Sequence, residues 1–141
     1  MNDNQDIDLS SGISAFEGKH FAQAMKLLAP IAEQGEPEAQ YRVAIMFQNG
    51  LGVVRNELKA FGFMKQAAEA GHALAQHGLG FMYMDGECAE RNGEKAVEWF
   101  TRAADQGLVG SKTTLALMYQ EGTLVEKNDE LAARLLKEAG F

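Results

Sequence analysis

Apolar side chains along the chain form two helical stripes that recur. In the stretch 36–71 the first stripe has apolar residues at i, i+4, i+7 and i+8, which is one face of an α-helix. These residues are Ala39, Val43, Met46 and Phe47. A second stripe with helical spacing follows and consists of Ala60, Phe63, Met64 and Ala67. The pattern predicts two helices joined by a loop, and no stretch alternates as a strand would.

The same pattern returns twice more at a spacing of 36 residues. Two series of glycines mark it: Gly35, Gly71 and Gly107, and Gly50, Gly86 and Gly122. An asparagine suited to capping a helix start precedes each second stripe, at Asn56, Asn92 and Asn128. Small residues at 44, 80 and 116 indicate close approach between neighbouring helices. Repetition of this kind is typical of a tandem array of one small supersecondary unit.

Residues 9–35 contain a shortened copy of the unit, with a first helix that ends at Gly18 and a shorter connection. The chain therefore predicts four helix-turn-helix repeats, 9–35, 36–71, 72–107 and a truncated 108–141, within a single repeat domain, 1–141. Each pair of helices has too small a core to be stable alone and must stack on its neighbours. The expected fold class is all-α, an α-solenoid of eight antiparallel helices with a concave and a convex face.

Several runs in the second unit resemble a known repeat. The runs are 39–47, Gly50-Leu51-Gly52-Val53, Lys59-Ala60 and 67–71, and they are similar to the Sel-one-like repeat (SLR), a relative of the tetratricopeptide repeat. The resemblance implies a right-handed superhelix and a protein-binding scaffold or adaptor, with no shared reaction. The equivalents of Gly52 are Cys88 and Leu124, so those two loops are expected to run differently.

Composition narrows the choice of partner. The 141 residues carry 13 basic and 20 acidic side chains, a net charge of −7, which disfavours nucleic acid and anionic membrane surfaces. The acidic stretch 1–6 lacks the basic and apolar regions of a signal peptide, and no apolar run is long enough to span a bilayer. With a single cysteine, Cys88, the chain suits a reducing compartment. We expect a cytoplasmic protein.

Enzymatic motifs are absent from the sequence. His72 and His77 are five residues apart, which on a helix places them about 140° apart, too far to share a metal ion. No phosphate-binding loop, nucleophile elbow or dinucleotide motif occurs. Acidic neighbours of Cys88 are expected to make its thiol unreactive. The sequence predicts no catalytic residues, no metal and no cofactor.

On the first helix of each of the last three repeats, the face opposite the core is apolar. A face that contacted only water would be expected to carry polar residues. Ile45 and its equivalents lie there, about 200° from the core stripe, and they are flanked by aromatic, amide and other side chains. The resemblance implies that this face binds a peptide or a helix of a partner protein in a concave groove. An alternative is that it packs against neighbouring helices. The predicted groove residues are Tyr41, Ile45, Gln48, His77, Phe81, Met84, Thr113, Leu117 and Gln120.

A second candidate surface appears when the repeats are compared. At the positions of Leu51, Val54 and Leu58 the other repeats have polar residues, so these three are predicted to be exposed, together with Phe61. Exposed apolar clusters commonly mark contacts between chains. The alternative function is therefore a structural assembly unit that forms a homodimer or docks into a larger complex. In the other interpretation of the cluster, it fills a gap left by the shortened first repeat.

Overall fold

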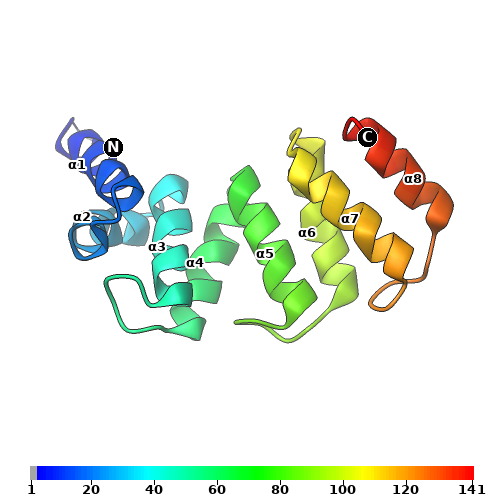
Figure 1. Ribbon diagram of the computed structural model, residues 1–141. Coiled ribbons are helices and arrows are strands. Elements are labelled where there is room, and N and C mark those ends of the chain that lie inside the picture. Colours follow the sequence, from blue (N-terminus) through cyan, green and yellow to red (C-terminus); the bar gives the residue numbers. More distant parts are fainter. Residues whose placement is uncertain (1–2) are drawn as a thin grey trace. The chain divides into compact units, whose positions relative to one another are not determined.

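The computed structural model describes residues 3–141, in which the chain forms helices joined by loops and no strand (Figure 1). The eight helices are α1 (Asp3–Glu17), α2 (Phe21–Glu33), α3 (Pro37–Asn49), α4 (Glu57–Glu69), α5 (Ala73–Asp85), α6 (Gly93–Asp105), α7 (Val109–Glu121) and α8 (Asp129–Glu138). They form the four predicted pairs. The all-α helix-turn-helix repeat architecture is therefore confirmed. Residues 1 and 2, at the start of the acidic N-terminal stretch, lie outside the described residues.

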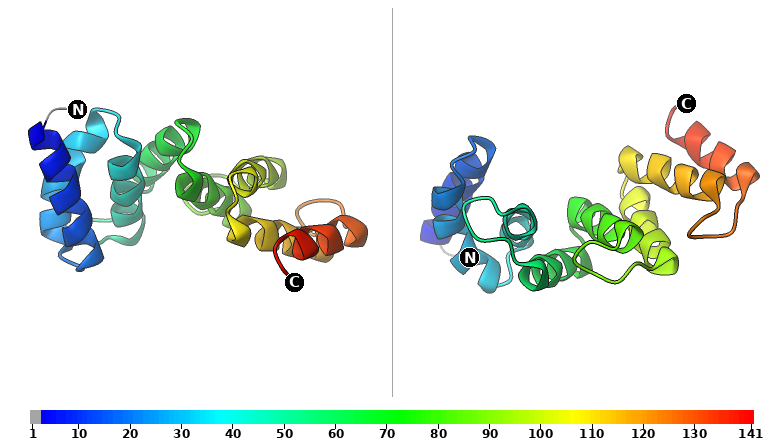
Figure 2. Two further views of the ribbon diagram at one scale, coloured as in Figure 1. Left: turned by 90° about the horizontal axis from the view of Figure 1, so that it is seen from above. Right: turned by 60° about the horizontal axis from the view of Figure 1, so that its bottom comes forward.

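The chain forms two compact units, Met1–Ala75 and Gln76–Phe141, called unit 1 and unit 2 below. The boundary falls inside α5. In unit 1, α1 packs on α2 and α3 on α4, and in unit 2, α7 packs on both α6 and α8. Figure 2 shows α7 and α8 side by side from two further directions. The prediction that the repeats form one domain stays a prediction.

The predicted helix caps account for where the second helix of each of the last three repeats begins. Asn56, Asn92 and Asn128 each accept a hydrogen bond of 3.0 Å from the backbone N–H three residues later. Such side-chain acceptors satisfy amides that the first turn leaves without a partner. Gly50 and Gly122 follow α3 and α7 in the left-handed conformation, with φ of 66° and 65°. The spacing of these residues therefore sets the helix boundaries as predicted.

The first repeat differs from the others in its connection. Helix α1 begins before residue 9 and ends at Glu17, and α2 begins at Phe21 after only three residues. Lys19 lies in this turn with a left-handed φ of 64°. The predicted short connection is confirmed.

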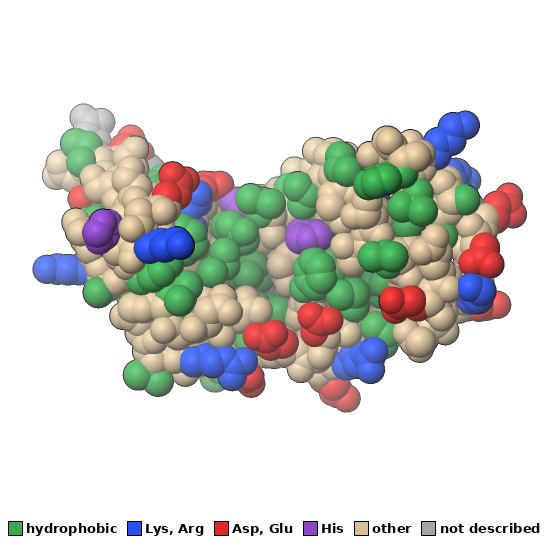
Figure 3. All heavy atoms as spheres, viewed as in Figure 1, with side chains coloured by type: hydrophobic (Ala, Val, Ile, Leu, Met, Phe, Trp, Pro, Cys, Tyr) green, Lys and Arg blue, Asp and Glu red, His purple; other side chains and the backbone are tan. Residues whose placement is uncertain are grey.

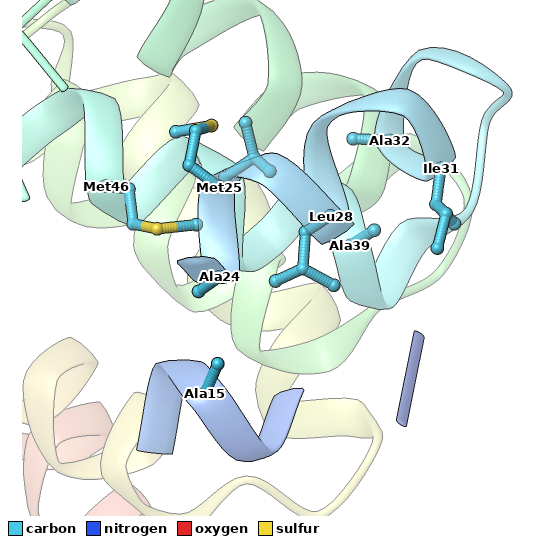
Figure 4. Packing of buried hydrophobic residues seen from close by; sticks show 9 residues of the cluster. Ala15, Ala24, Met25, Leu28, Ile31, Ala32, Ala39 and Met46 are labelled. Atoms are coloured by element: carbon cyan, nitrogen blue, oxygen red, sulfur yellow. The ribbon is translucent and has the colours of Figure 1, made fainter. Parts of the chain in front are cut away.

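The core of unit 1 is built from small and medium-sized apolar side chains of α1, α2 and α3 (Figure 4). Its buried members are Ala15, Ala24, Met25, Leu28, Ile31, Ala32, Ala39, Val43 and Met46. Gly12 allows the closest packing here, because a Cβ at this position would lie 2.5 Å from Leu28 Cδ2. The mixture of alanines and longer side chains lets the helices interdigitate at interior packing density.

The core of unit 2 is centred on aromatic side chains of α6. Phe100 is fully buried, and Trp99 is 7% exposed, as its place on the second stripe predicts. Gly80 of α5 faces Phe100, whose ring carbons would lie 2.8 Å from a Cβ. The small residue at position 80 thus leaves space for the Phe100 ring, whereas the prediction was close approach of a neighbouring helix backbone.

Candidate interaction surfaces

The predicted groove residues lie outside the fully buried core in both units. Leu117 is the most exposed apolar member, at 54%, and Gln120 is also exposed. The remaining members are half-buried: Tyr41, Ile45, Gln48, His77, Phe81, Met84 and Thr113. The helix faces that carry these residues are thus neither sealed in the core nor purely polar.

In unit 1, Tyr41 belongs to a polar network at the start of α5. Its ring stacks on His72 at 4.9 Å, and burial raises the pKa of the Tyr41 hydroxyl. His72 Nδ1 accepts the Ala75 N–H at 3.1 Å and thereby caps α5. Its Nε2 lies 2.6 Å from Glu38 Oε1. This role of His72 was not predicted, and Tyr41 is held in place by it.

Glu38 and Arg42 extend the network along α3. Arg42 forms an ion pair with Glu38, and its Nη2 lies 3.8 Å from Glu17 Oε1. Its guanidinium carbon lies 5.6 Å from the centre of the Phe16 ring. Burial alone would raise the pKa of Glu38, but hydrogen bonds from Arg42 and His72 outweigh it, so the pKa is lowered. The carboxylate therefore stays ionised at neutral pH and ties α3 to the start of α5.

In unit 2, His77 joins α5 to α7 within an aromatic cluster. Its Nδ1 lies 2.7 Å from the Ser111 hydroxyl oxygen, and its ring meets Phe81 and Phe100 edge-on at 4.8 and 5.3 Å. Burial lowers the pKa of the imidazole, so it is neutral at pH 7. Ser111 is fully buried, so its hydroxyl lies in the interior between α5 and α7. The histidine–serine pair is therefore a packing contact.

A pocket of about 350 Å³ opens beside this cluster. Its lining residues come from α5, α7 and the loops that follow them: Phe81, Met84, Asp85, Arg91, Thr114, Leu117, Met118, Glu121, Thr123 and Leu124. Three of the predicted groove residues, Phe81, Met84 and Leu117, lie in its wall. Figure 3 shows apolar side chains over α5 and α7 on this face of unit 2, with acidic side chains along its lower edge.

Comparison with known proteins identifies the repeat. Residues 37–72, 73–108 and 115–140 match the family model described as Sel1 repeat. The chain belongs to the Sel1 repeat family. This confirms the resemblance read from the sequence. Helical repeats of this family generally serve in protein–protein interaction. A separate search of curated proteins found no match.

Two solved structures share the Sel1 repeat fold. One is c5321, a protective antigen present in uropathogenic Escherichia coli strains that displays an SLR fold; its TM-score is 0.89 at 29% identity. The other is a Sel1 repeat protein from Oxalobacter formigenes, with a TM-score of 0.85 at 31% identity. The matches cover 96% and 94% of this chain but only 30% and 53% of those proteins.

The Sel1 repeats also carry a basic residue that was not predicted to have a role. In each of the last three repeats it donates a hydrogen bond to a backbone carbonyl in the last turn of the first helix. The pairs are Arg55 with Gln48, Arg91 with Met84, and Lys127 with Gln120, at 2.8, 3.2 and 2.7 Å. Cationic donors satisfy helix C-terminal carbonyls. Their 36-residue spacing was the signal that could have revealed them.

The backbone conformation of the loop differs from expectation at one position, Cys88, which is equivalent to Gly52 and Leu124. Gly52 has a left-handed φ of 72°, and Cys88 adopts nearly the same conformation, with φ of 65°. The expected change of path at Cys88 is therefore wrong for its backbone conformation. Leu124 is not in the left-handed region. The half-buried Cys88 keeps the local geometry that glycine provides in the preceding repeat.

The second predicted surface divides into an exposed and a packed part. Val54 and Leu58 are 88% and 82% exposed. Leu51 is half-buried and packs against the core of unit 1, as the gap-filling interpretation predicted. Phe61 is half-buried, and Lys65 Nζ lies 5.9 Å from the centre of its ring. The expected exposure therefore holds for Val54 and Leu58 and is wrong for Leu51.

Metal-binding groups and membrane-spanning helices were searched for in residues 3–141 of this Sel1 repeat chain. Among the residues the structure describes, no three or more His, Cys, Asp or Glu side chains gather as metal ligands would. Within the same residues, no helix combines the length and apolar character that crossing a bilayer requires.

Proposed function

We propose that this protein is a noncatalytic interaction module, an adaptor or scaffold that binds a peptide or helix of a partner protein in a concave groove. Of the predicted groove residues, Tyr41, Ile45 and Gln48 belong to unit 1 and the other six belong to unit 2. The exposure of Leu117 carries the proposal, because a leucine 54% exposed beside a pocket is available for contact. Membership of the Sel1 repeat family supports it.

Rigid support of the groove also favours binding. Phe81 is held edge-on against Phe100 at 5.2 Å, so its ring is fixed before any partner arrives. A preformed aromatic wall lowers the entropy lost on association. Met84, with its flexible thioether, adapts to the shape of a ligand.

Replacing Leu117 with alanine is expected to weaken partner binding about tenfold, since apolar anchors in concave sites carry much of the binding energy. Affinity capture with mass spectrometry would supply the partner, and calorimetric titration would measure the affinity. Val109→Ala is the matched control, because Val109 lies on the same helix, is 50% exposed and does not line the pocket. An unchanged affinity for Leu117→Ala with a lowered melting temperature would mean that Leu117 serves only packing.

The exposed pair Val54 and Leu58 favours a second candidate function, assembly through self-association. The two repeats that follow have glutamate at both equivalent positions: Glu90 and Glu126, and Glu94 and Glu130. Glutamate is therefore compatible with the repeat at these sites. Clusters of exposed apolar side chains are typical of contact surfaces.

The double variant Val54→Glu, Leu58→Glu is expected to abolish self-association while leaving the melting temperature nearly unchanged, because both side chains are exposed. Sedimentation velocity at several concentrations would compare it with the wild type. Leu51→Glu is the contrasting control and is expected to lower the melting temperature, since Leu51 packs on the core. A wild type that stays monomeric at every concentration would contradict the assembly function.

A further inference from the structure

Five of the ten residues that line the pocket beside the His77 cluster are apolar. Phe81 and Met84 come from α5, Leu117 and Met118 from α7, and Leu124 from the loop after α7. Its volume of about 350 Å³ is near the lower end of the range of roughly 300–1,000 Å³ usual for ligand pockets. It is therefore suited to side chains of a short segment and too small for a folded domain.

One end of the pocket is negative. Asp85 is the last residue of α5 and Glu121 the last of α7, and both side chains are exposed. The C-terminal end of a helix carries partial negative charge from its free carbonyls, which attracts cations and repels carboxylates. Both acids thus occupy positions that helix stability disfavours. Within residues 3–141 neither carboxylate forms an ion pair.

Arg91 is the one basic residue among the lining residues, and it offsets only part of the negative charge at this end. Its Nε donates to the Met84 carbonyl oxygen at 3.2 Å, as its equivalents do in the other repeats. Arg55 and Lys127 also pair with the acidic residue two positions later, but Gly93 stands there after Arg91. A side chain is excluded at Gly93, because a Cβ would lie 2.3 Å from the Leu124 carbonyl oxygen. The lining retains two carboxylates and one guanidinium.

We infer that this pocket binds a short segment of a partner protein in which an apolar side chain stands next to a lysine or arginine. The apolar side chain fills the space between Phe81 and Leu117, and the cation lies at the end formed by Asp85 and Glu121. The overall charge of −7 also favours a positively charged partner. The inference rests on the proposed function, since it specifies the ligand of one part of the groove.

The probe is a phage-displayed library of random decapeptides selected on the full chain. Selected peptides are expected to carry Lys or Arg within two residues of Leu, Met or Phe, and to bind more weakly as salt rises. Synthetic copies would then be titrated against Asp85→Asn, Glu121→Gln. The double variant is expected to lose about tenfold in affinity at low salt, without a fall in melting temperature, because both acids are removed from helix C-termini.

Glu33→Gln, Glu69→Gln is the matched control. It makes the same change in net charge at exposed positions of unit 1 that do not line the pocket, and it should leave peptide affinity unchanged. A charge-reversed pocket, Asp85→Lys, Glu121→Lys, is expected to select acidic peptides instead.

The outcomes separate the inference from the proposed function. Selected peptides without basic residues that lose affinity with Leu117→Ala overturn the inference and leave the groove function standing. Equal losses in the pocket and control variants also overturn it, because overall charge would then explain the binding. Failure to select any peptide overturns both.

Discussion

Replacing Phe100 with alanine is expected to lower the free energy of unfolding by about 3–5 kcal/mol, the usual cost of emptying a large aromatic core site. Phe100 is fully buried and is the largest such side chain in the described part of the chain. It supports Phe81 and His77 through edge-on contacts at 5.2 and 5.3 Å. The variant should therefore lose stability and also loosen the wall of the pocket.

Urea unfolding followed by the emission of Trp99 would measure the change, since this single tryptophan is 7% exposed in the same helix. Leu136→Ala is the matched control at the equivalent position of the last repeat, where the side chain is only half-buried. Its cost should be clearly smaller, because less apolar surface is lost from the core. Similar costs for both variants would contradict the central role of Phe100.

Much of the fold could be predicted from the sequence because local rules act at every repeat. The stripe Ala60, Phe63 and Met64 fixes which face of α4 is apolar, and Asn56 fixes where the helix begins. These signals depend on side chains within one or two turns of each other. Their repetition at 36 residues gave the number of helices.

The contacts of individual side chains could not be predicted in the same way. His72 stands where the neighbouring repeats have Glu36 and Leu108, so comparison of repeats gave no reason to expect it to cap α5 and bind Glu38. Glu38 and Tyr41, both on α3, meet His72 there, which lies just before α5. Such a network depends on tertiary packing, which the periodicity does not encode.

Leu51 shows how a position can change its environment between repeats. Polar equivalents in the later repeats suggested exposure, but in unit 1 the loop of Leu51 lies against α2 of the shortened first repeat. The candidate groove stays a prediction, made because its residues recur on one face of the first helix in the last three repeats. The pocket and its charged end required the structure, since Asp85, Arg91 and Glu121 meet only through tertiary packing.

Replacing Gly52 with alanine is expected to destabilise the protein by about 2–4 kcal/mol, because two penalties combine. Its φ of +72° lies in the left-handed region, which disfavours a side chain. A Cβ would also lie 2.5 Å from the carbonyl carbon of Phe21 and 2.7 Å from the amide nitrogen of Ala22. Both are backbone atoms, so relief requires the start of α2 to move.

Gly62→Ala is the matched control, since Gly62 lies inside α4 and a Cβ there would meet nothing within 4 Å. Alanine is favoured over glycine within a helix, so this variant should gain about 0.5–1 kcal/mol. Thermal and urea unfolding of both variants would give changes of opposite sign. Equal stability of Gly52→Ala and the wild type would mean that the loop after α3 does not lie against α2, and the packed position of Leu51 would then lose its explanation.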